Sequence, residues 1–320
     1  MKEIVTFGGG TGTFVVLRAL RTLDDVSLTA IVSGADDGGS TGALRDAYGF
    51  LPAGDVRQAL VALSEDDTIL RELFAYRFGK GNVSGHNLGN LFLTALTDIL
   101  GSNTEAIEEA SRILRISGRV VCSTDTPATL VATLEDGTVI RGEHSIDERE
   151  SNRTKITELA YEEQLLLSVA ALNAVREADY IVVGPGDLYT STVASLLATG
   201  TRDIIESSQA KIVYVMNLFT KAGQTTGLSA QDHIKILTRY MGRTPDYVVV
   251  NKGTFTQDVL DLYASEGEYP VIDDVGQDES IIRADIASVS TVPALPGDPV
   301  PRSLLRHDPE KLATVCKTLL

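Results

Sequence analysis

The feature that most constrains the fold is a run of glycines set between an apolar segment and a helical one. Residues 3–7 form a short apolar run, residues 8–12 read Gly-Gly-Gly-Thr-Gly, and residues 13–20 have helical spacing. The pattern predicts a strand, a glycine turn and a helix. Glycines allow the backbone to approach a ligand closely, and the free N–H groups of a first helical turn favour an anion. We therefore expect a phosphate to lie against Gly9, Gly10, Thr11 and Gly12.

A second apolar run, residues 26–32, ends in another glycine-rich stretch that carries two carboxylates. We expect that loop to join the same nucleotide site, through Asp36, Asp37, Gly38, Gly39 and Ser40. The ends of two parallel strands meet at one edge of a sheet, which is the usual place for a nucleotide. The match to the dinucleotide fingerprint is imperfect, because its third glycine position holds Thr13. A P-loop of the Gly-Lys-Ser/Thr type is absent.

The composition narrows the class of partner. The chain has 320 residues, 28 basic and 44 acidic, and a net charge of −16, which argues against binding to nucleic acid or to an anionic membrane surface. Cys122 and Cys316 form no C-x-x-C motif, so neither a zinc site nor a disulfide framework is indicated. The sequence shows no signal peptide and no stretch long enough to span a bilayer, and we expect a cytoplasmic location.

The remaining periodicities predict an α/β protein with a mostly parallel sheet and helices on both faces. Predicted strands cover residues 180–183, 212–215 and 247–250, besides the first two, and each stops at a polar or glycine-rich loop. We expect one domain, interrupted at about 66–150 by helices and a hairpin. In and around that insertion we expect helices at 55–64, 68–78, 88–100 and 105–114, the last capped by Asn103, and strands at 119–123, 128–135 and 138–143 with an Asp136-Gly137 turn. A helix at 165–177 and another from about Ser191 follow, and the charged stretch 147–155 is an exposed loop or a lid.

Several side chains are candidates for chemistry. Asp37 and Asp55 can share Mg²⁺, which prefers a few carboxylates together with phosphate oxygens, although Asp55 is equally suited to cap a helix. His86, Asn87 and Asn90 lie at the head of a helix, where they can face a ligand or serve only structure. No Ser/His/Asp set with the spacing of a hydrolytic triad accompanies them.

The strand at 180–183 ends in a second glycine turn, with Gly184, Gly186 and Asp187, before hydroxyl groups at a helix start. Two such turns on one sheet suggest a ligand with two recognisable ends. Asp187 would repel a phosphate, so we expect it to cap the helix or to bind a ribose hydroxyl. Asn217, at the end of the next strand, suits recognition of a sugar or a base, or stabilises its own turn.

These blocks, in order over about 300 residues, resemble the YvcK branch of the YvcK/CofD family. They are the glycine runs at 8–12 and 184–187, Ala35–Ser40, Leu51–Arg57, and Gly85–Asn90, and the resemblance continues through 217–220, the Asp232-His233 pair and Arg306–Asp308. The resemblance implies a Rossmann-like fold. It also implies a UDP-sugar ligand such as UDP-N-acetylglucosamine, and a role as a gluconeogenesis factor in cell shape and cell-wall synthesis, without settled enzymatic activity.

The resemblance further assigns residues and alternatives. Aspartates matching Asp37 and Asp55 are associated with metal in the CofD branch, while Tyr263 and Arg306 match positions associated with the UDP-sugar. The loops after residues 7 and 183 would then hold the diphosphate. The rival is a CofD-like, Mg²⁺-dependent transferase of a phospholactyl group, and an NAD(P)-dependent oxidoreductase is weaker still. We also expect protein partners in cell-wall metabolism and a homodimer or higher homo-oligomer. Phe14 and the proline-rich stretch 288–301 depart from the family pattern.

Overall fold

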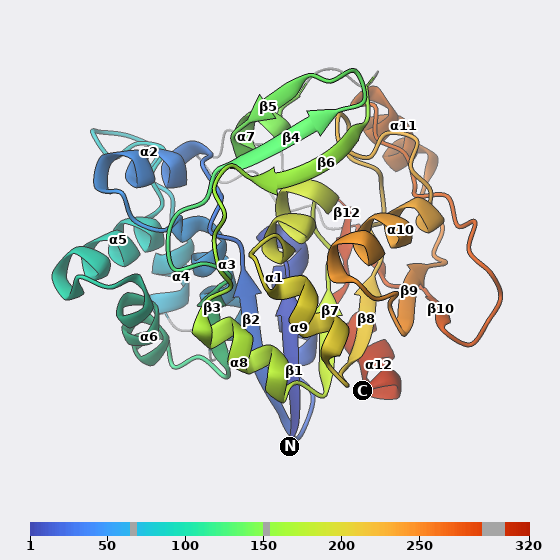
Figure 1. Ribbon diagram of the computed structural model, residues 1–320, viewed down its shortest axis with the longest axis horizontal. Helices are drawn as coiled ribbons and strands as arrows, with labels where there is room; N and C mark the ends of the chain where they lie inside the picture. The colour runs from blue at the N-terminus through green and yellow to red at the C-terminus, as the bar shows by residue number, and fades with distance from the viewer. Residues whose placement is uncertain (65–68, 150–153, 290–304) are drawn as a thin grey trace.

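A seven-stranded, entirely parallel sheet forms the centre of the computed structural model, which describes residues 1–64, 69–149, 154–289 and 305–320 (Figure 1). The strand order is β10-β9-β8-β7-β1-β2-β3. The strands are β1 (Lys2–Phe7), β2 (Val26–Val32), β3 (Arg119–Cys122), β7 (Tyr180–Val183), β8 (Lys211–Val215), β9 (Tyr247–Asn251) and β10 (Ile281–Ala284). This is a Rossmann-like α/β fold, as predicted.

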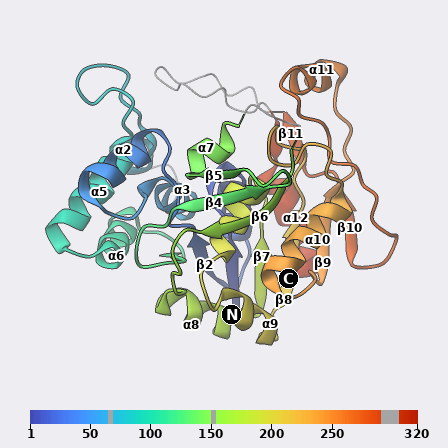
Figure 2. The ribbon, with the colours of Figure 1, turned by 45° about the horizontal axis from the view of Figure 1, so that its top comes forward.

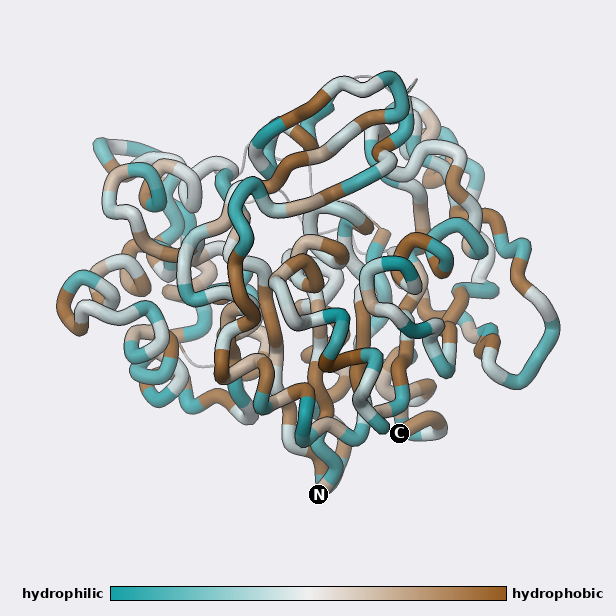
Figure 3. Tube along the Cα trace, viewed as in Figure 1, coloured by the Kyte–Doolittle hydropathy of each residue, from teal (hydrophilic) through white to brown (hydrophobic). Residues whose placement is uncertain are grey.

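Helices cover both faces of this sheet. One face packs against α1 (Gly10–Leu20), α3 (Ala53–Leu63) and α12 (Pro309–Leu319), and the other against α8 (Val169–Glu177), α9 (Thr201–Ser207) and α10 (Ala230–Met241). Alternate residues of one strand serve the two layers: in β2, Ala30 and Val32 pack with the first group and Ile31 with the second. The strands are therefore apolar almost throughout, as the brown central tube in Figure 3 shows.

Two further layers surround the sheet. A helical layer beside β3 contains α2 (Gly39–Tyr48), α4 (Ile69–Ala75), α5 (Leu88–Leu100) and α6 (Asn103–Leu114). A small antiparallel sheet, ordered β5-β4-β6, lies above the carboxyl ends of the central strands, as Figures 1 and 2 show; it contains β4 (Leu130–Leu134), β5 (Val139–Arg141), β6 (Ile156–Tyr161) and the short helix α7 (Glu143–Asp147). Leu130, Ile146 and Leu159 anchor it in the core.

The remaining elements frame the carboxyl ends of β7 to β9. They are the π-helical turn η1 (Leu188–Val193), the 3₁₀ turn η2 (Ala194–Leu196), α11 (Gln257–Ser265) and the antiparallel pair β11 (Ala287–Val289) and β12 (Leu305–His307). None of the helices that the structure describes is long and apolar enough to cross a membrane.

The predicted strand ends and the hairpin around Asp136 and Gly137 are confirmed, but several local predictions are wrong. The N-cap of α6 is Ser102, whose hydroxyl accepts the Glu105 N–H, and not Asn103. Asp55 is not a cap either, because α3 begins two residues earlier behind Pro52. The glycine-rich stretch after Asp37 is helical from Gly39 onward, and not a loop.

Other boundaries shift in the same way. The helix predicted at 165–177 begins at Val169, since Ser168 caps it, and the one predicted from Ser191 begins at Leu188. The strand β6 was not expected. Thr68 and residues 150–153 of the predicted exposed loop lie outside the described residues, as does most of the stretch 288–301.

Candidate functional site

A cleft of about 920 Å³ opens at the carboxyl ends of β1, β7 and β8. Its lining comes from α3 and α4, from the start of α1, from the loop after β8, and from α11 and β12 themselves. Of the predicted site residues, the cleft brings together Gly9, Gly10, Thr11, Gly12, Asn87, Gly186, Asp187, Asn217, Tyr263 and Arg306. The described lining does not include Asp36, Asp37, Gly38, Gly39, Ser40, His86, Asn90, Gly184 or Asp55.

The glycine turn after β1 is the floor of this cleft. Gly10 has φ +67°, which favours glycine, and it begins α1. A Cβ on Gly12 would lie 2.3 Å from the carbonyl oxygen of Pro185, so only glycine allows α1 to approach the turn after β7 this closely. Thr13, at the third position of the dinucleotide fingerprint, is buried, and a Cβ on Gly8 would lie 2.4 Å from its hydroxyl oxygen. This turn leaves the Thr11 and Gly12 N–H groups at the helix N-terminus.

Asp55 lies directly behind the glycine turn. The Gly10 N–H donates to Oδ1 of Asp55 at 2.8 Å, and a Cβ on Gly9 would meet Oδ2 at 2.0 Å. Burial and the neighbouring Asp36 raise the pKa of Asp55 to about 7, although the bond from Gly10 and the charge of Arg57 lower it. Near neutral pH this carboxyl therefore exchanges a proton beside the place expected for phosphate.

The two aspartates after β2 have separate partners. Asp36 accepts the Gly38 N–H at 3.0 Å, and burial is the main cause that raises its pKa. Asp37 accepts the N–H groups of Glu143 and His144 at 3.2 and 2.8 Å, and Arg45 lies 3.8 Å away. Asp37 thus ties the segment after β2 to the start of α7, whereas Asp55 contacts the glycine turn.

The acidic side chains of the described residues do not form a preformed metal site. Within the described ranges, no three His, Cys, Asp or Glu side chains are placed to hold one ion. Both Asp37 oxygens accept backbone N–H groups, and one Asp55 oxygen accepts from Gly10. Glu143 adds a further carboxyl nearby, where burial and Asp36 raise its pKa to about 9. Asp37 and Asp55 are thus not a preformed Mg²⁺ site, and their sharing of an ion together with phosphate oxygens stays a prediction.

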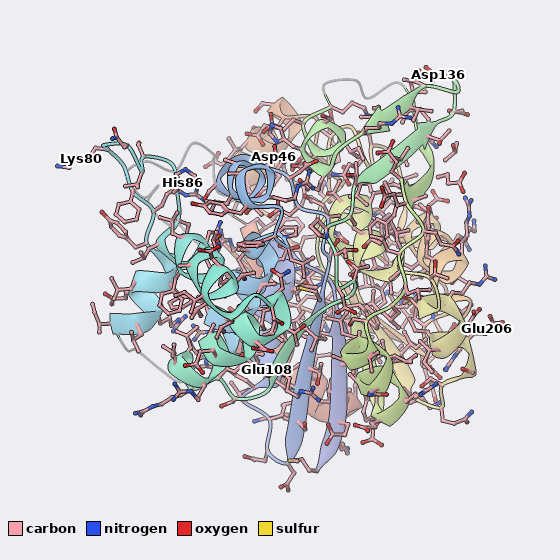
Figure 4. All side chains as sticks on the ribbon, turned by 60° about the vertical axis from the view of Figure 1, so that its left-hand side comes forward. Asp46, Lys80, His86, Glu108, Asp136 and Glu206 are labelled. Atoms are coloured by element: carbon pink, nitrogen blue, oxygen red, sulfur yellow. The ribbon has the colours of Figure 1, made fainter. Side chains whose placement is uncertain are left out.

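The polar residues at the start of α5 make contacts that hold the local structure. His86 Nδ1 lies 3.1 Å from the Ser40 hydroxyl, which joins α2 to the loop before α5; Figure 4 shows His86 between this loop and α2. Asn87 caps α5, since its Oδ1 accepts the Gly89 N–H at 2.9 Å, and Asn90 accepts from Arg57 Nε at 3.0 Å. Of these three, Asn87 alone reaches the described lining of the cleft.

The turn after β7 is tied to the end of β8. Asn217 donates from Nδ2 to the Gly186 carbonyl at 2.6 Å and accepts from the Tyr214 hydroxyl at 3.3 Å. Asp187 stands at the N-cap of η1 without a capping side-chain bond. Burial and Asp147 raise the pKa of Asp187 to about 7, while Lys221 lowers it. The Asp187 carboxyl thus faces Asp147 and Lys221, which also line the cleft, and does not cap the helix.

Tyr263 and Arg306 are linked through the backbone. The Leu305 N–H donates to the Tyr263 hydroxyl at 3.1 Å, so Tyr263 fixes the strand β12 that carries Arg306. The Tyr263 ring lies 4.5 Å from that of Phe219, which also lines the cleft. An aromatic wall of this kind suits stacking of a base.

Several lining residues were not predicted as site residues from the sequence: Arg57, Arg71, Arg77, Phe219 and His307. His307 is buried, and burial lowers its pKa to about 4, so its ring is neutral and Nε2 donates to the Met216 carbonyl at 3.0 Å. Phe219 and Lys221 flank the end of β8, where position alone suggested a site. The arginines come from α3, from α4 and from the segment just after α4, outside the βα loops, and gave no such signal.

Comparisons with known proteins agree with one another. Residues 4–291 match the family model described as 2-phospho-L-lactate transferase CofD. A protein of Thermotoga maritima is 40% identical over 317 residues, 99% of each chain, and the gluconeogenesis factor of Halalkalibacterium halodurans is 39% identical over 315 residues, 98% of this chain and 94% of that one. The crystal structure of a UPF0052 family member from Bacillus halodurans superposes with a TM-score of 0.88 at 37% identity, covering 98% of this chain and 99% of that one.

Proposed function

Because this chain belongs to the CofD family, we propose that it binds a nucleotide sugar of the UDP-N-acetylglucosamine type in the cleft above α1 and acts as a regulatory protein. The name gluconeogenesis factor, given to a relative that matches nearly end to end, supports this choice over a transferase. The proposed role is that of a cytoplasmic gluconeogenesis factor, which sustains cell shape and the cell wall during growth on gluconeogenic carbon sources.

One observation carries the proposal: the glycine turn at the N-terminus of α1 and the packed aromatic rings of Phe219 and Tyr263 line the same cleft. The Thr11 and Gly12 N–H groups and the helix dipole favour the diphosphate. Phe219 gives the base a surface to stack on, and Asn217 and Asp187 offer polar atoms to the ribose. Arg306 adds a positive charge on the same wall.

Substitution of the two predicted contacts tests this arrangement. Arg306→Gln removes a cation that faces the ligand, so the Kd for UDP-N-acetylglucosamine should rise roughly tenfold or more by calorimetry. Tyr263→Phe keeps the ring but releases the Leu305 N–H, so a smaller rise of the same sign is expected. Arg112→Gln, on the exposed surface of α6, is the matched control. Unchanged affinity in both cleft variants would remove Tyr263 and Arg306 from the site.

The second candidate is a CofD-like transferase, which the family model and Asp55 favour. Mg²⁺, when bound, would neutralise the charge that develops on the departing nucleotide. The chain's own contribution would be Asp55, whose carboxyl accepts the Gly10 N–H and has a pKa of about 7. The transferase is tested by incubating the protein with a guanosine diphosphate-activated phospholactyl donor, an acceptor and Mg²⁺. Release of the nucleotide by the parent protein, and its loss in Asp55→Ala, would favour the enzyme.

A further inference from the structure

The cleft continues past the glycine turn to a second, cationic end. Arg57 from α3, Arg71 from α4 and Arg77 just after α4 line this end, and Glu72 is the one acidic residue that the described lining places with them. At the opposite end, Lys221 and Arg306 are outnumbered by Asp147, Asp187 and Glu268. Among the described lining residues, positive charges therefore outnumber negative ones at this end and not at the other, in a chain whose net charge is −16.

Arg57 is held in a defined orientation. Its Nε donates to Asn90 Oδ1 at 3.0 Å, and its stem crosses Gly89, where a Cβ would meet Cδ at 2.8 Å. Asn90 is itself buried and bonded to Thr41 at 3.3 Å, so the guanidinium rests on a fixed support. Arg77 is anchored through the Gly85 carbonyl at 2.8 Å. Positioned guanidinium groups are suited to carboxylate or phosphate.

The order of the sheet gives the order of the subsites. The ends of β8, β7 and β1 are successive neighbours, so the aromatic wall, the turn after β7 and the glycine turn follow one another, and α3 and α4 come next. A ligand with its base on Phe219 and its diphosphate over α1 therefore directs its far end toward the arginines. The volume, about 920 Å³, lies near the upper limit for ligand pockets, which leaves room beyond a neutral sugar.

We propose that Arg57, Arg71 and Arg77 form an anion subsite that binds a carboxylate or phosphate group distinct from the diphosphate of the nucleotide sugar. This deepens the proposed function, because it uses the same cleft. The anion is either carried by the sugar itself or supplied as a separate molecule. Both sources share the chemistry that a cluster of guanidinium groups recognises.

Two calorimetric titrations distinguish the sources. The first compares UDP-N-acetylglucosamine with UDP-N-acetylmuramate, which adds one lactyl carboxylate to the same sugar. The second titrates inorganic phosphate into protein alone and into protein saturated with UDP-N-acetylglucosamine. Each is repeated with the double variant Arg71→Gln/Arg77→Gln and with Arg112→Gln/Arg202→Gln, which removes the same charge from exposed helix surfaces outside the cleft. Arg57 is left in place because it supports the start of α5.

If the anion is on the sugar, the acid should bind about tenfold more tightly than the neutral sugar, and the cleft variant alone should abolish that ratio. If the anion is a separate molecule, phosphate should bind the protein saturated with UDP-N-acetylglucosamine. This binding should be lost in Arg71→Gln/Arg77→Gln and kept in Arg112→Gln/Arg202→Gln. The subsite is refuted if neither ligand responds to the arginines. Failure of both nucleotide sugars to bind refutes the proposed function instead, and arginine-dependent binding of phosphate to the free protein would then still support the subsite.

Discussion

Gly12 tests how closely the floor of the cleft is packed. Gly12→Ala places a methyl group 2.3 Å from the Pro185 carbonyl oxygen, so α1 or the turn after β7 must move. We expect a loss of stability of about 1–3 kcal/mol, measured by denaturant unfolding. Gly276→Ala is the control, since its Cβ meets only an Asp278 oxygen at 3.7 Å, and its stability should change by about 0.5 kcal/mol or less. Equal effects in both variants would contradict this packing.

Asp55 gives a pH dependence with a definite sign. Its pKa is about 7 in the folded protein against 3.8 ordinarily, so between these values the folded state binds more protons than the unfolded state. The contribution of Asp55 to stability must therefore fall as pH rises from about 4 to about 7, and level off above. Asp55→Asn does not titrate, so its stability relative to the parent should increase across that window. A constant difference between the two proteins at pH 4, 5.5 and 7 would be evidence against the raised pKa.

The start of the helix α7 is held by one side chain that is distant in the sequence. Asp37 accepts two of its backbone N–H groups, from Glu143 and His144. Asp37→Ala leaves both without this acceptor, and amide hydrogen exchange at these positions should accelerate about tenfold or more. Asp46→Ala, an exposed change on α2, should leave them as they are. Unaltered exchange in Asp37→Ala would mean that Asp37 is free for another role, such as the predicted metal.

The sequence predicted six of the seven parallel strands, because each is a mostly apolar run that stops at or next to a glycine or a polar residue; it missed β10, which contains Arg283. It did not predict α2, since Gly38 and Gly39 were interpreted as loop, although Gly39 opens a helix with φ +45°. It also missed β6, whose burial alternates irregularly across a β-bulge beside β4. The local sequence pattern reveals that a helix or strand exists, whereas its packing against neighbouring elements decides where it begins.

The same limit applies to the candidate site. Gly9 to Gly12, Gly186 and Asn217 were predictable because βα loops gather at the carboxyl edge of a parallel sheet. Arg57 and Arg71 were not, because they lie within helices and reach the cleft only through the packing of α3 and α4. Asp36 and Asp37 follow a strand of the same edge but point to α3 and α7. A position at the carboxyl edge of the sheet therefore makes a residue a candidate for the site, but does not show that its side chain reaches the cleft.

At the scale of the whole molecule, the net charge of the chain affects how ligand affinity depends on salt. A chain of net charge −16 repels a nucleotide diphosphate at long range, and salt screens that repulsion. The attraction at the cleft comes from helix N–H groups and nearby cations, which salt weakens less when they are partly buried. Affinity for UDP-N-acetylglucosamine should therefore change by less than about threefold between 50 and 300 mM NaCl, measured by calorimetry. A steep loss with salt would indicate surface attraction in place of the cleft.

The most direct test of the central claim is a calorimetric titration of the purified protein with UDP-N-acetylglucosamine, GDP and NAD, each with and without Mg²⁺. A nucleotide-sugar regulator binds UDP-N-acetylglucosamine at one site, in preference to GDP and NAD, and leaves it chemically unchanged. Preference for GDP with a strict requirement for Mg²⁺ would contradict this account and favour the transferase, and preference for NAD would contradict both.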